Sequence, residues 1–109
     1  MGISKTEHFT EEQNDVAKLM KALSHPARIA IVEYLLSVDT CICNDIVDEI
    51  KLAQPTVSQH LKELKNAGII QGEIDGKAIC YCINPNTLKK MEHFISEIFR
   101  KIEKQKSCC

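Results

Sequence analysis

The chain has 109 residues, a formal net charge of −1 and a hydrophobic fraction of 44%. A chain of this length supports one domain with a small core, so we expect a single domain over 1–109, with flexible ends at about 1–9 and 105–109. No apolar run reaches the ~20 residues of a membrane-spanning helix, and no signal peptide is visible, so we expect a cytoplasmic protein with no membrane partner. The charge is not strongly basic, which weakens a nucleic-acid function without excluding it.

The first third of the chain predicts two helices separated by a proline. Thr10 is a suitable N-cap, and apolar residues recur from there to Leu23 at helical spacing. Pro26 is favourable in the first turn of a second helix, which we expect to continue to about Ser37. Because this second helix is apolar on nearly all sides, we expect it to be the buried centre of the domain.

The middle of the chain predicts a helix-turn-helix followed by a β-hairpin. A short helix over roughly Cys43 to Ile50 precedes a second helix that starts at Pro55 and closes at Ala67-Gly68. Strands over 69–74 and 78–83 flank Asp75-Gly76, a dipeptide typical of tight hairpins. The predicted fold is mainly α with a small β-hairpin, a winged helix-turn-helix.

A long last helix is predicted from a cap at Asn86 or Thr87 to about Lys104. Its apolar stripe is longer than a small core requires, so we expect a homodimer through the first and last helices. The stripe consists of Leu88, Met91, Ile95, Ile98, Phe99 and Ile102.

The second helix of the helix-turn-helix is suited to the major groove of double-stranded DNA. Its predicted outer face carries polar side chains that can hydrogen-bond to bases or phosphates. These are Gln54, Thr56, Ser58, Gln59, His60 and Lys62. Lys77, beside the hairpin turn, is predicted to contact the phosphate backbone. The alternative interpretation is an ordinary solvated helix face.

Six cysteines form two C-x-C pairs and one adjacent pair, with no C-x-x-C, which does not fit a zinc finger. In a reducing compartment such thiols bind metal or react more often than they form structural disulfides. Cys41 and Cys43 would point about 200° apart on a helix. One ion can therefore hold both only if the helix start unwinds or the pair lies outside it, and binding would reorient the first helix of the DNA-reading pair.

Three segments together resemble the ArsR/SmtB family of bacterial metal-responsive repressors, most of all its arsenic-responsive members. They are LSHPAR at 23–28, QPTVSQHLK at 54–62 and LKNAGII at 64–70. The resemblance extends over about 17–102. It implies a homodimeric repressor of an arsenic or antimony resistance operon that leaves a pseudo-palindromic operator when As(III) or Sb(III) binds cysteine thiolates.

The same resemblance assigns roles to individual residues. It implies that Gln54, Ser58 and Gln59 touch the operator, although Pro55 stands where the family often has serine. Cys41-Ile42-Cys43-Asn44-Asp45 resembles the cysteine-bearing start of the third helix in arsenic, antimony, cadmium and lead sensors.

The arsenic pattern is incomplete, because Ile46 stands where a third cysteine is expected. A three-thiolate site must then recruit another group. Cys108 and Cys109 are our first choice, since the end of the last helix is expected to reach the third helix.

Cys80 and Cys82 are the second choice for a further ligand. As alternate residues of a strand they face the same side, although packing on one face of the wing is the simpler interpretation. The family's other metal site, on the last helix, is not matched, because only His93 of its pattern is present. The remaining histidines are dispersed in sequence, which favours structural or solvated roles.

Four alternatives remain. A repressor of the same fold is able to sense reactive sulfur or oxidants by linking an upstream thiol to a tail thiol. It is also able to sense a soft divalent metal such as cadmium, lead or zinc. A thiol reductase lacks an evident nucleophile–base pair or C-x-x-C motif, so we expect no catalytic residues and no catalytic cofactor. A dimerisation module that does not bind DNA is the fourth.

Overall fold

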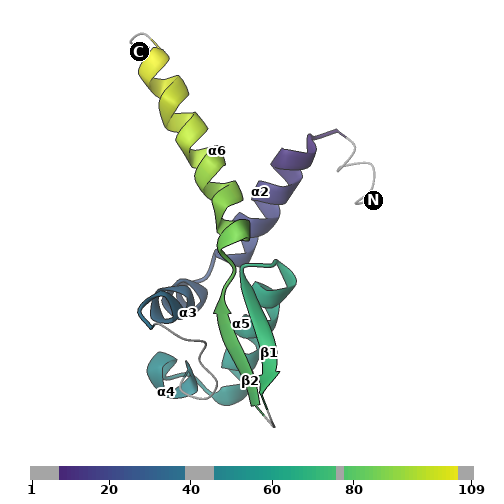
Figure 1. Cartoon of the computed structure of the whole chain (residues 1–109), viewed down its shortest axis with the longest axis vertical. Helices are drawn as coiled ribbons and strands as arrows, with labels where there is room; N and C mark the ends of the chain where they lie inside the picture. The colour runs from purple at the N-terminus through teal and green to yellow at the C-terminus, as the bar shows by residue number, and fades with distance from the viewer. Residues whose placement is uncertain (1–7, 39–45, 76–77, 106–109) are drawn as a thin grey trace.

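The computed structural model describes residues 8–38, 46–75 and 78–105. The predicted flexible ends lie largely outside these residues. The described elements are α2 (Glu11–Ala22), α3 (Pro26–Leu36), α4 (Ile46–Ile50), α5 (Gln54–Asn66), β1 (Ile70–Asp75), β2 (Ala78–Ile83) and α6 (Pro85–Lys104). In Figure 1, α3, α4, α5 and the hairpin gather at one end of the molecule, while α2 and α6 extend toward the other.

The starts of α2 and α3 follow the predicted signals. Thr10 forms a capping box, in which its side-chain oxygen accepts from the Gln13 N–H at 3.0 Å and its own N–H donates to Gln13 Oε1 at 2.9 Å. Pro26 occupies the first turn of α3, and His25 caps that helix by accepting the Ala27 N–H on Nδ1 at 3.0 Å.

The start of α6 differs from the prediction by two residues. The cap is Asn84, whose side chain accepts the Asn86 N–H at 3.1 Å, and Pro85 lies in the first turn. Asn84 also donates its backbone N–H to the Ile69 carbonyl at 2.9 Å, so one residue ends the hairpin and begins the helix. This is why α6 follows β2 without a linker.

The two strands pair antiparallel, with Ile70 opposite Ile83 at one end and Asp75 opposite Ala78 at the other. This register leaves residues 76–77 between the paired strands, one residue later than the predicted Asp75-Gly76 turn, because β1 extends to Asp75. Within the described residues, β1 and β2 make up a single two-stranded sheet. The predicted hairpin is therefore confirmed.

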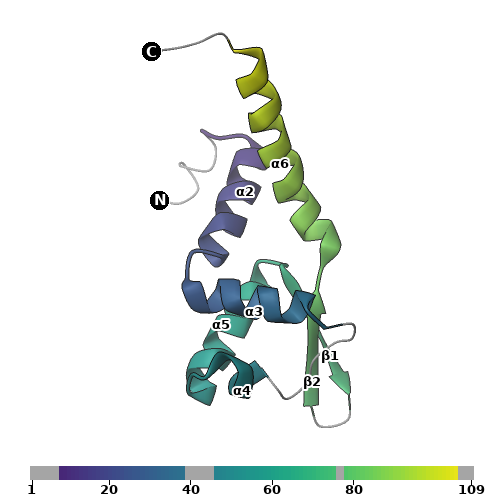
Figure 2. The ribbon, with the colours of Figure 1, turned by 90° about the vertical axis from the view of Figure 1, so that its left-hand side faces the viewer.

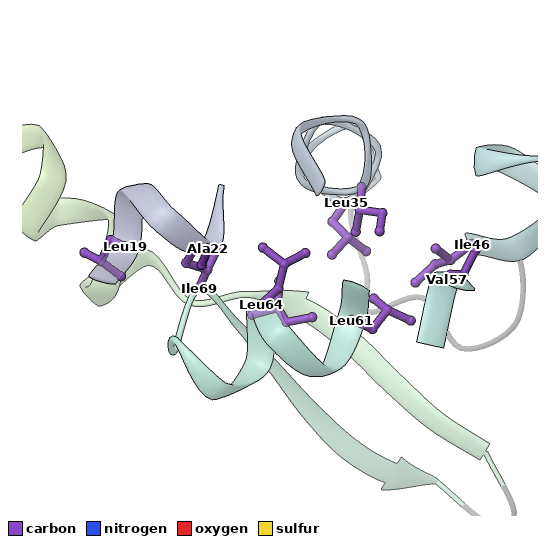
Figure 3. Packing of buried hydrophobic residues seen from close by; sticks show 10 residues of the cluster. Leu19, Ala22, Leu35, Ile46, Val57, Leu61, Leu64 and Ile69 are labelled. Carbon is purple, nitrogen blue, oxygen red and sulfur yellow. The ribbon is translucent and has the colours of Figure 1, made fainter. Parts of the chain in front are cut away.

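One buried cluster joins α2, α3, α4, α5 and the start of β1 (Figure 3). Its members are Leu19, Ala22, Ile31, Leu35, Ile46, Val57, Leu61, Leu64, Ile69 and Ile70. Ile31, Val57 and Leu64 are completely inaccessible to solvent. Truncating such a leucine to alanine costs about 2–5 kcal/mol, so this cluster fixes α5 on the other helices.

The prediction that α3 is buried on nearly all sides is wrong. Ile31 and Leu35, one helical turn apart, are buried, whereas Ile29 is 42% and Leu36 is 62% exposed. A core this small covers one face of the helix only. Apolar composition alone did not reveal which face that is.

Gly68 turns the chain from α5 into β1. Its φ of 81° lies in the left-handed region, and the next N–H, of Ile69, donates to the Leu64 carbonyl at 3.0 Å. A Cβ at this glycine would stand 3.3 Å from Thr87 Oγ1 on α6. The close approach fixes the hairpin and α6 relative to the end of α5.

Helix α6 departs from the core along its length. Leu88 and Met91 are partly buried against the cluster, but no residue of α6 is fully buried. Figure 2 shows α6 projecting beyond the hairpin, beside α2. The distal half therefore extends well past the core that holds its base.

Candidate nucleic-acid interface

The outer face of α5 presents the polar side chains predicted to contact DNA. Gln54, Thr56, Ser58, Gln59 and Lys62 are all exposed. The opposite face of the same helix is buried in the core. The helix is thus a rigidly mounted element with a free polar side, which is the arrangement that major-groove reading requires.

Gln59 and Glu63 are linked along this face. The Gln59 Nε2 donates to Glu63 Oε2 at 3.0 Å, one helical turn away. The bond orients the amide and leaves its carbonyl oxygen and second N–H available. An amide with one free donor and one free acceptor can make the paired contact that adenine presents in the major groove.

The turn between α4 and α5 has a strained backbone. Lys51 has a φ of 64°, a conformation that costs a side-chain-bearing residue about 1–2 kcal/mol. Its N–H donates to the Val47 carbonyl at 3.0 Å, which closes the end of α4. Ala53, at the N-cap of α5, provides no side-chain hydrogen bond, so the first N–H groups of α5 are left for solvent or a phosphate.

The prediction that His60 lies on the outer face is wrong. Its side chain is 8% exposed, and Nδ1 accepts a hydrogen bond from Arg28 Nε at 3.1 Å. Position 60 is three residues after Val57 and four before Leu64, so it belongs to the buried stripe of α5. The sequence shows this spacing, but histidine is a polar residue, and its polarity favoured the prediction of an exposed position.

Arg28 and two histidines tie α5 to the α2–α3 corner. Arg28 Nη1 donates to the Ala22 carbonyl at 3.1 Å, and the His25 ring centroid is 4.5 Å from that of His60. Burial, followed by the charges of His25 and Arg28, lowers the pKa of His60 below its usual 6.5. The neutral ring is the form that accepts the Arg28 bond. Histidines that are dispersed in sequence are therefore neighbours in the fold.

The cysteines are only partly described. Cys41, Cys43, Cys108 and Cys109 lie outside the described residues, as does Lys77. The two wing cysteines lie on β2, where Cys80 is buried, Cys82 is half-buried and both are disulfide-bonded. Within 8–38, 46–75 and 78–105, no three His, Cys, Asp or Glu side chains are grouped so as to hold a metal ion.

Comparison with known proteins identifies the family. The family model described as bacterial regulatory protein, arsR family, matches residues 25–71. A biofilm growth-associated repressor of Xylella fastidiosa is 32% identical over 103 residues, covering 90% of both chains. The chain belongs to the ArsR family of bacterial regulatory proteins.

Other similarities of this ArsR-family protein agree with that assignment. The HTH-type transcriptional repressor SmtB of Mycobacterium tuberculosis is 45% identical over 64 residues, which are 59% of this chain and 47% of SmtB. The chain thus matches about half the length of that relative. The structure of an ArsR-like transcriptional regulator from Rhodococcus superposes with a TM-score of 0.74 at 19% identity, covering 87% of this chain and 89% of that one.

The predicted fold class is confirmed, because the mainly helical chain with its two-stranded hairpin shares the fold of winged-helix regulators. The prediction that the protein is not an enzyme is also confirmed, since its relatives are transcriptional regulators. In the described part of the chain, no helix has the length and apolarity needed to cross a membrane.

Proposed function

We propose that this ArsR-family protein is a homodimeric repressor of an arsenic or antimony resistance operon. It binds a pseudo-palindromic operator through α5 and leaves it when As(III) or Sb(III) binds cysteine thiolates. The observation that carries the proposal is the exposed polar face of α5 on a buried core, with Cys41 and Cys43 just upstream of α4 in the chain.

DNA recognition is assigned to the exposed residues of α5. Gln54, Ser58 and Gln59 are suited to base edges, because amides and hydroxyls provide paired donors and acceptors there. Thr56 and Lys62 are suited to phosphates, which position the protein and make its affinity depend on salt. Lys77 extends this phosphate contact to the wing. His60 supports α5 from behind and touches no DNA.

The path from inducer to DNA is short. Cys43 lies three residues before Ile46, which begins α4 and belongs to the same buried cluster as Val57 of α5. An ion that draws two thiolates together acts at the start of α4, and α4 packs on α5. Soft thiolates bind soft, thiophilic ions strongly. If the ion binds the DNA-free conformation more tightly than the DNA-bound one, this difference in affinity determines how far it shifts the equilibrium between the two conformations.

A third thiolate is needed if the ion is trivalent arsenic or antimony. The two sources in this chain are the C-terminal pair, Cys108 and Cys109, and the wing pair, Cys80 and Cys82.

The homodimer is supported by an uncovered apolar stripe on α6. Ile95, Ile98, Phe99 and Ile102 recur at helical spacing, and Phe99 is 61% and Ile102 is 53% exposed. The stripe continues from the part of α6 that packs on the core. Large apolar side chains aligned on one face indicate an association surface, and a second copy offers the same self-complementary stripe.

Phe99→Glu tests the dimer, with Lys101→Glu as a matched control on the same helix. A carboxylate in the middle of an apolar interface is costly to desolvate, so Phe99→Glu should be monomeric by analytical ultracentrifugation, while Lys101→Glu should sediment as a dimer. Dimeric Phe99→Glu would exclude the α6 interface.

Fluorescence anisotropy on a labelled duplex from the promoter upstream of the protein's own gene tests the DNA function. Wild-type affinity should fall on adding arsenite. The double variant Cys41→Ser, Cys43→Ser should bind the duplex as tightly as wild type, and its affinity should not change when arsenite is added. The double variant Ser58→Ala, Gln59→Ala should bind the duplex weakly at all arsenite concentrations. A normal arsenite response of the cysteine variant would remove Cys41 and Cys43 from the site.

A second candidate function is favoured by the disulfide-bonded state of Cys80 and Cys82. A repressor with the same DNA-reading helix would respond to oxidants or reactive sulfur through these thiols. Titrating the same complex with hydrogen peroxide, a persulfide and Cd²⁺ separates the functions. Release by peroxide or persulfide, with no response to arsenite, would favour the second.

A further inference from the structure

The outer face of α5 carries one acidic side chain that the sequence did not single out as part of the DNA interface. Glu63 lies one helical turn after Gln59, next to Lys62. Glu63 is half-buried, and Gln59 is exposed. Because Leu61 and Leu64 of the same helix are buried in the core, the backbone positions of Gln59 and Glu63 are fixed relative to the rest of the domain.

The Glu63 carboxylate is bonded to Gln59 rather than to a cation. Three cations, Lys18, Lys21 and Arg28, line the same surface hollow as this carboxylate. Within the described residues, none of the three forms an ion pair with it. Its Oε2 instead accepts the hydrogen bond from Gln59 Nε2 at 3.0 Å. The carboxylate therefore acts on the orientation of the glutamine amide.

A carboxylate restricts this amide in a way that a neutral partner does not. An ionised carboxylate only accepts hydrogen bonds, so the Nε2 end of Gln59 must face it. Rotating the amide by half a turn would put Gln59 Oε1 against Glu63 Oε2, which are two acceptors with no proton between them. A glutamine in water adopts either orientation, whereas Gln59 is held in one.

The restricted amide distinguishes the two purines. Guanine presents two acceptors in the major groove, a ring nitrogen and a keto oxygen, and a glutamine with both N–H groups available can donate to them. Gln59 has one N–H bonded to Glu63, so it offers one donor and one acceptor. Adenine presents a ring nitrogen that accepts and an amino group that donates, which matches this pair. Guanine would place its keto oxygen against Gln59 Oε1.

We propose that Glu63 is a positioning residue that makes Gln59 select adenine against guanine at one base pair of each operator half-site. The inference rests on the proposed function, in which α5 reads the operator. Glu63 contacts no base itself and acts through the Gln59 amide. Its negative charge repels phosphates and lowers the affinity for every sequence, so its contribution is to specificity, which is a difference between affinities.

Fluorescence anisotropy with base-substituted duplexes tests the selection. Each base pair of the promoter duplex is changed in turn, and Gln59→Ala locates the pair that Gln59 reads. Wild type should prefer adenine over guanine there by roughly tenfold or more. Glu63→Gln should reduce this preference to roughly threefold or less, because a glutamine at this position also donates and lets the Gln59 amide rotate. The change should come mainly from tighter binding of the guanine duplex.

Two controls isolate the role of the carboxylate. Glu49→Gln removes an exposed carboxylate from the neighbouring helix α4 and should keep the wild-type preference. Glu63→Ala in the Gln59→Ala background should change no base preference further, since a positioning residue acts only through its partner. If Glu63→Gln keeps the wild-type preference, or if Glu63→Ala alters a preference in the absence of Gln59, the inference is wrong while promoter binding and the proposed function stand.

Heteronuclear NMR of the side-chain amides tests the bond without DNA. One Nε2 proton of Gln59 should be shifted downfield by the carboxylate, relative to the protons of the exposed Gln54. Glu63→Ala should remove this difference, and Glu49→Gln should keep it. An unchanged Gln59 amide in Glu63→Ala would overturn the inference whether or not the protein binds DNA. If the difference is lost but wild type binds no promoter duplex, the proposed function fails and the selection of adenine fails with it.

Discussion

The bond between Arg28 and His60 predicts how one buried side chain stabilises the DNA-reading helix. His60→Leu keeps an apolar body at the site but removes the Nδ1 acceptor that Arg28 Nε contacts at 3.1 Å. The half-buried guanidinium then keeps only the Ala22 carbonyl, at 3.1 Å. Hydrogen bonds to charged groups contribute about 1.5–3 kcal/mol, so we expect the free energy of unfolding to fall by about 2 kcal/mol at a pH near 8.

The same bond predicts a pH dependence with a definite sign. The pKa of His60 is lowered in the folded state, mainly by burial and further by the charges of His25 and Arg28. Above the unfolded value of 6.5 the ring is neutral in both states and the full stability is present. As the pH falls below 6.5 toward the lowered pKa, the unfolded chain takes up a proton that the folded chain resists, so stability is lost.

Urea unfolding of wild type and His60→Leu at pH values of about 8 and about 5.5 measures both effects. The variant lacks the titrating ring, so the difference between the two proteins should be largest at the higher pH and shrink at the lower one. His93→Leu, at an exposed position of α6, is the control and should follow wild type at both. Equal pH slopes for wild type and His60→Leu would refute the role of the buried ring.

Three further predictions concern single positions. Gly68→Ala should lose about 1–2 kcal/mol, because alanine at a φ of 81° is strained and its Cβ meets Thr87 Oγ1; an unchanged thermal midpoint would contradict this. Lys51→Gly should raise the thermal midpoint by relieving up to about 1 kcal/mol at a φ of 64°, and a fall in the midpoint would count against strain in the turn. Lys62→Ala should weaken operator binding and reduce the slope of log affinity against log salt by about 0.9 for each lost phosphate contact; a slope equal to wild type would place Lys62 off the DNA.

Local signals were sufficient for most of the fold. Thr10 and Pro26 mark helix starts through their own hydrogen-bonding and backbone limits, so the sequence placed them within a residue. Asp75-Gly76 indicated the hairpin, although the strand pairing extends to Asp75 and leaves residues 76–77 between the strands. The start of α6 was misplaced because Asn84-Pro85 both ends a strand and begins a helix.

Tertiary contacts account for what the sequence did not reveal. The partner of His60 is Arg28, 32 residues away, and no local pattern connects them. The exposed side of α3 depends on how many elements pack around it, which apolar composition does not specify. Cys80 was expected to pack on one face of the wing, and it is buried.

The coupling of thiol capture to DNA release is tested most directly by one titration. Reduced wild-type protein is bound to its labelled promoter duplex, and arsenite is added while anisotropy is followed. We predict that saturating arsenite raises the dissociation constant of the duplex by roughly tenfold or more, with no such change in the Cys41→Ser, Cys43→Ser variant. A stable complex of protein, arsenite and duplex with undiminished affinity would contradict the proposed mechanism.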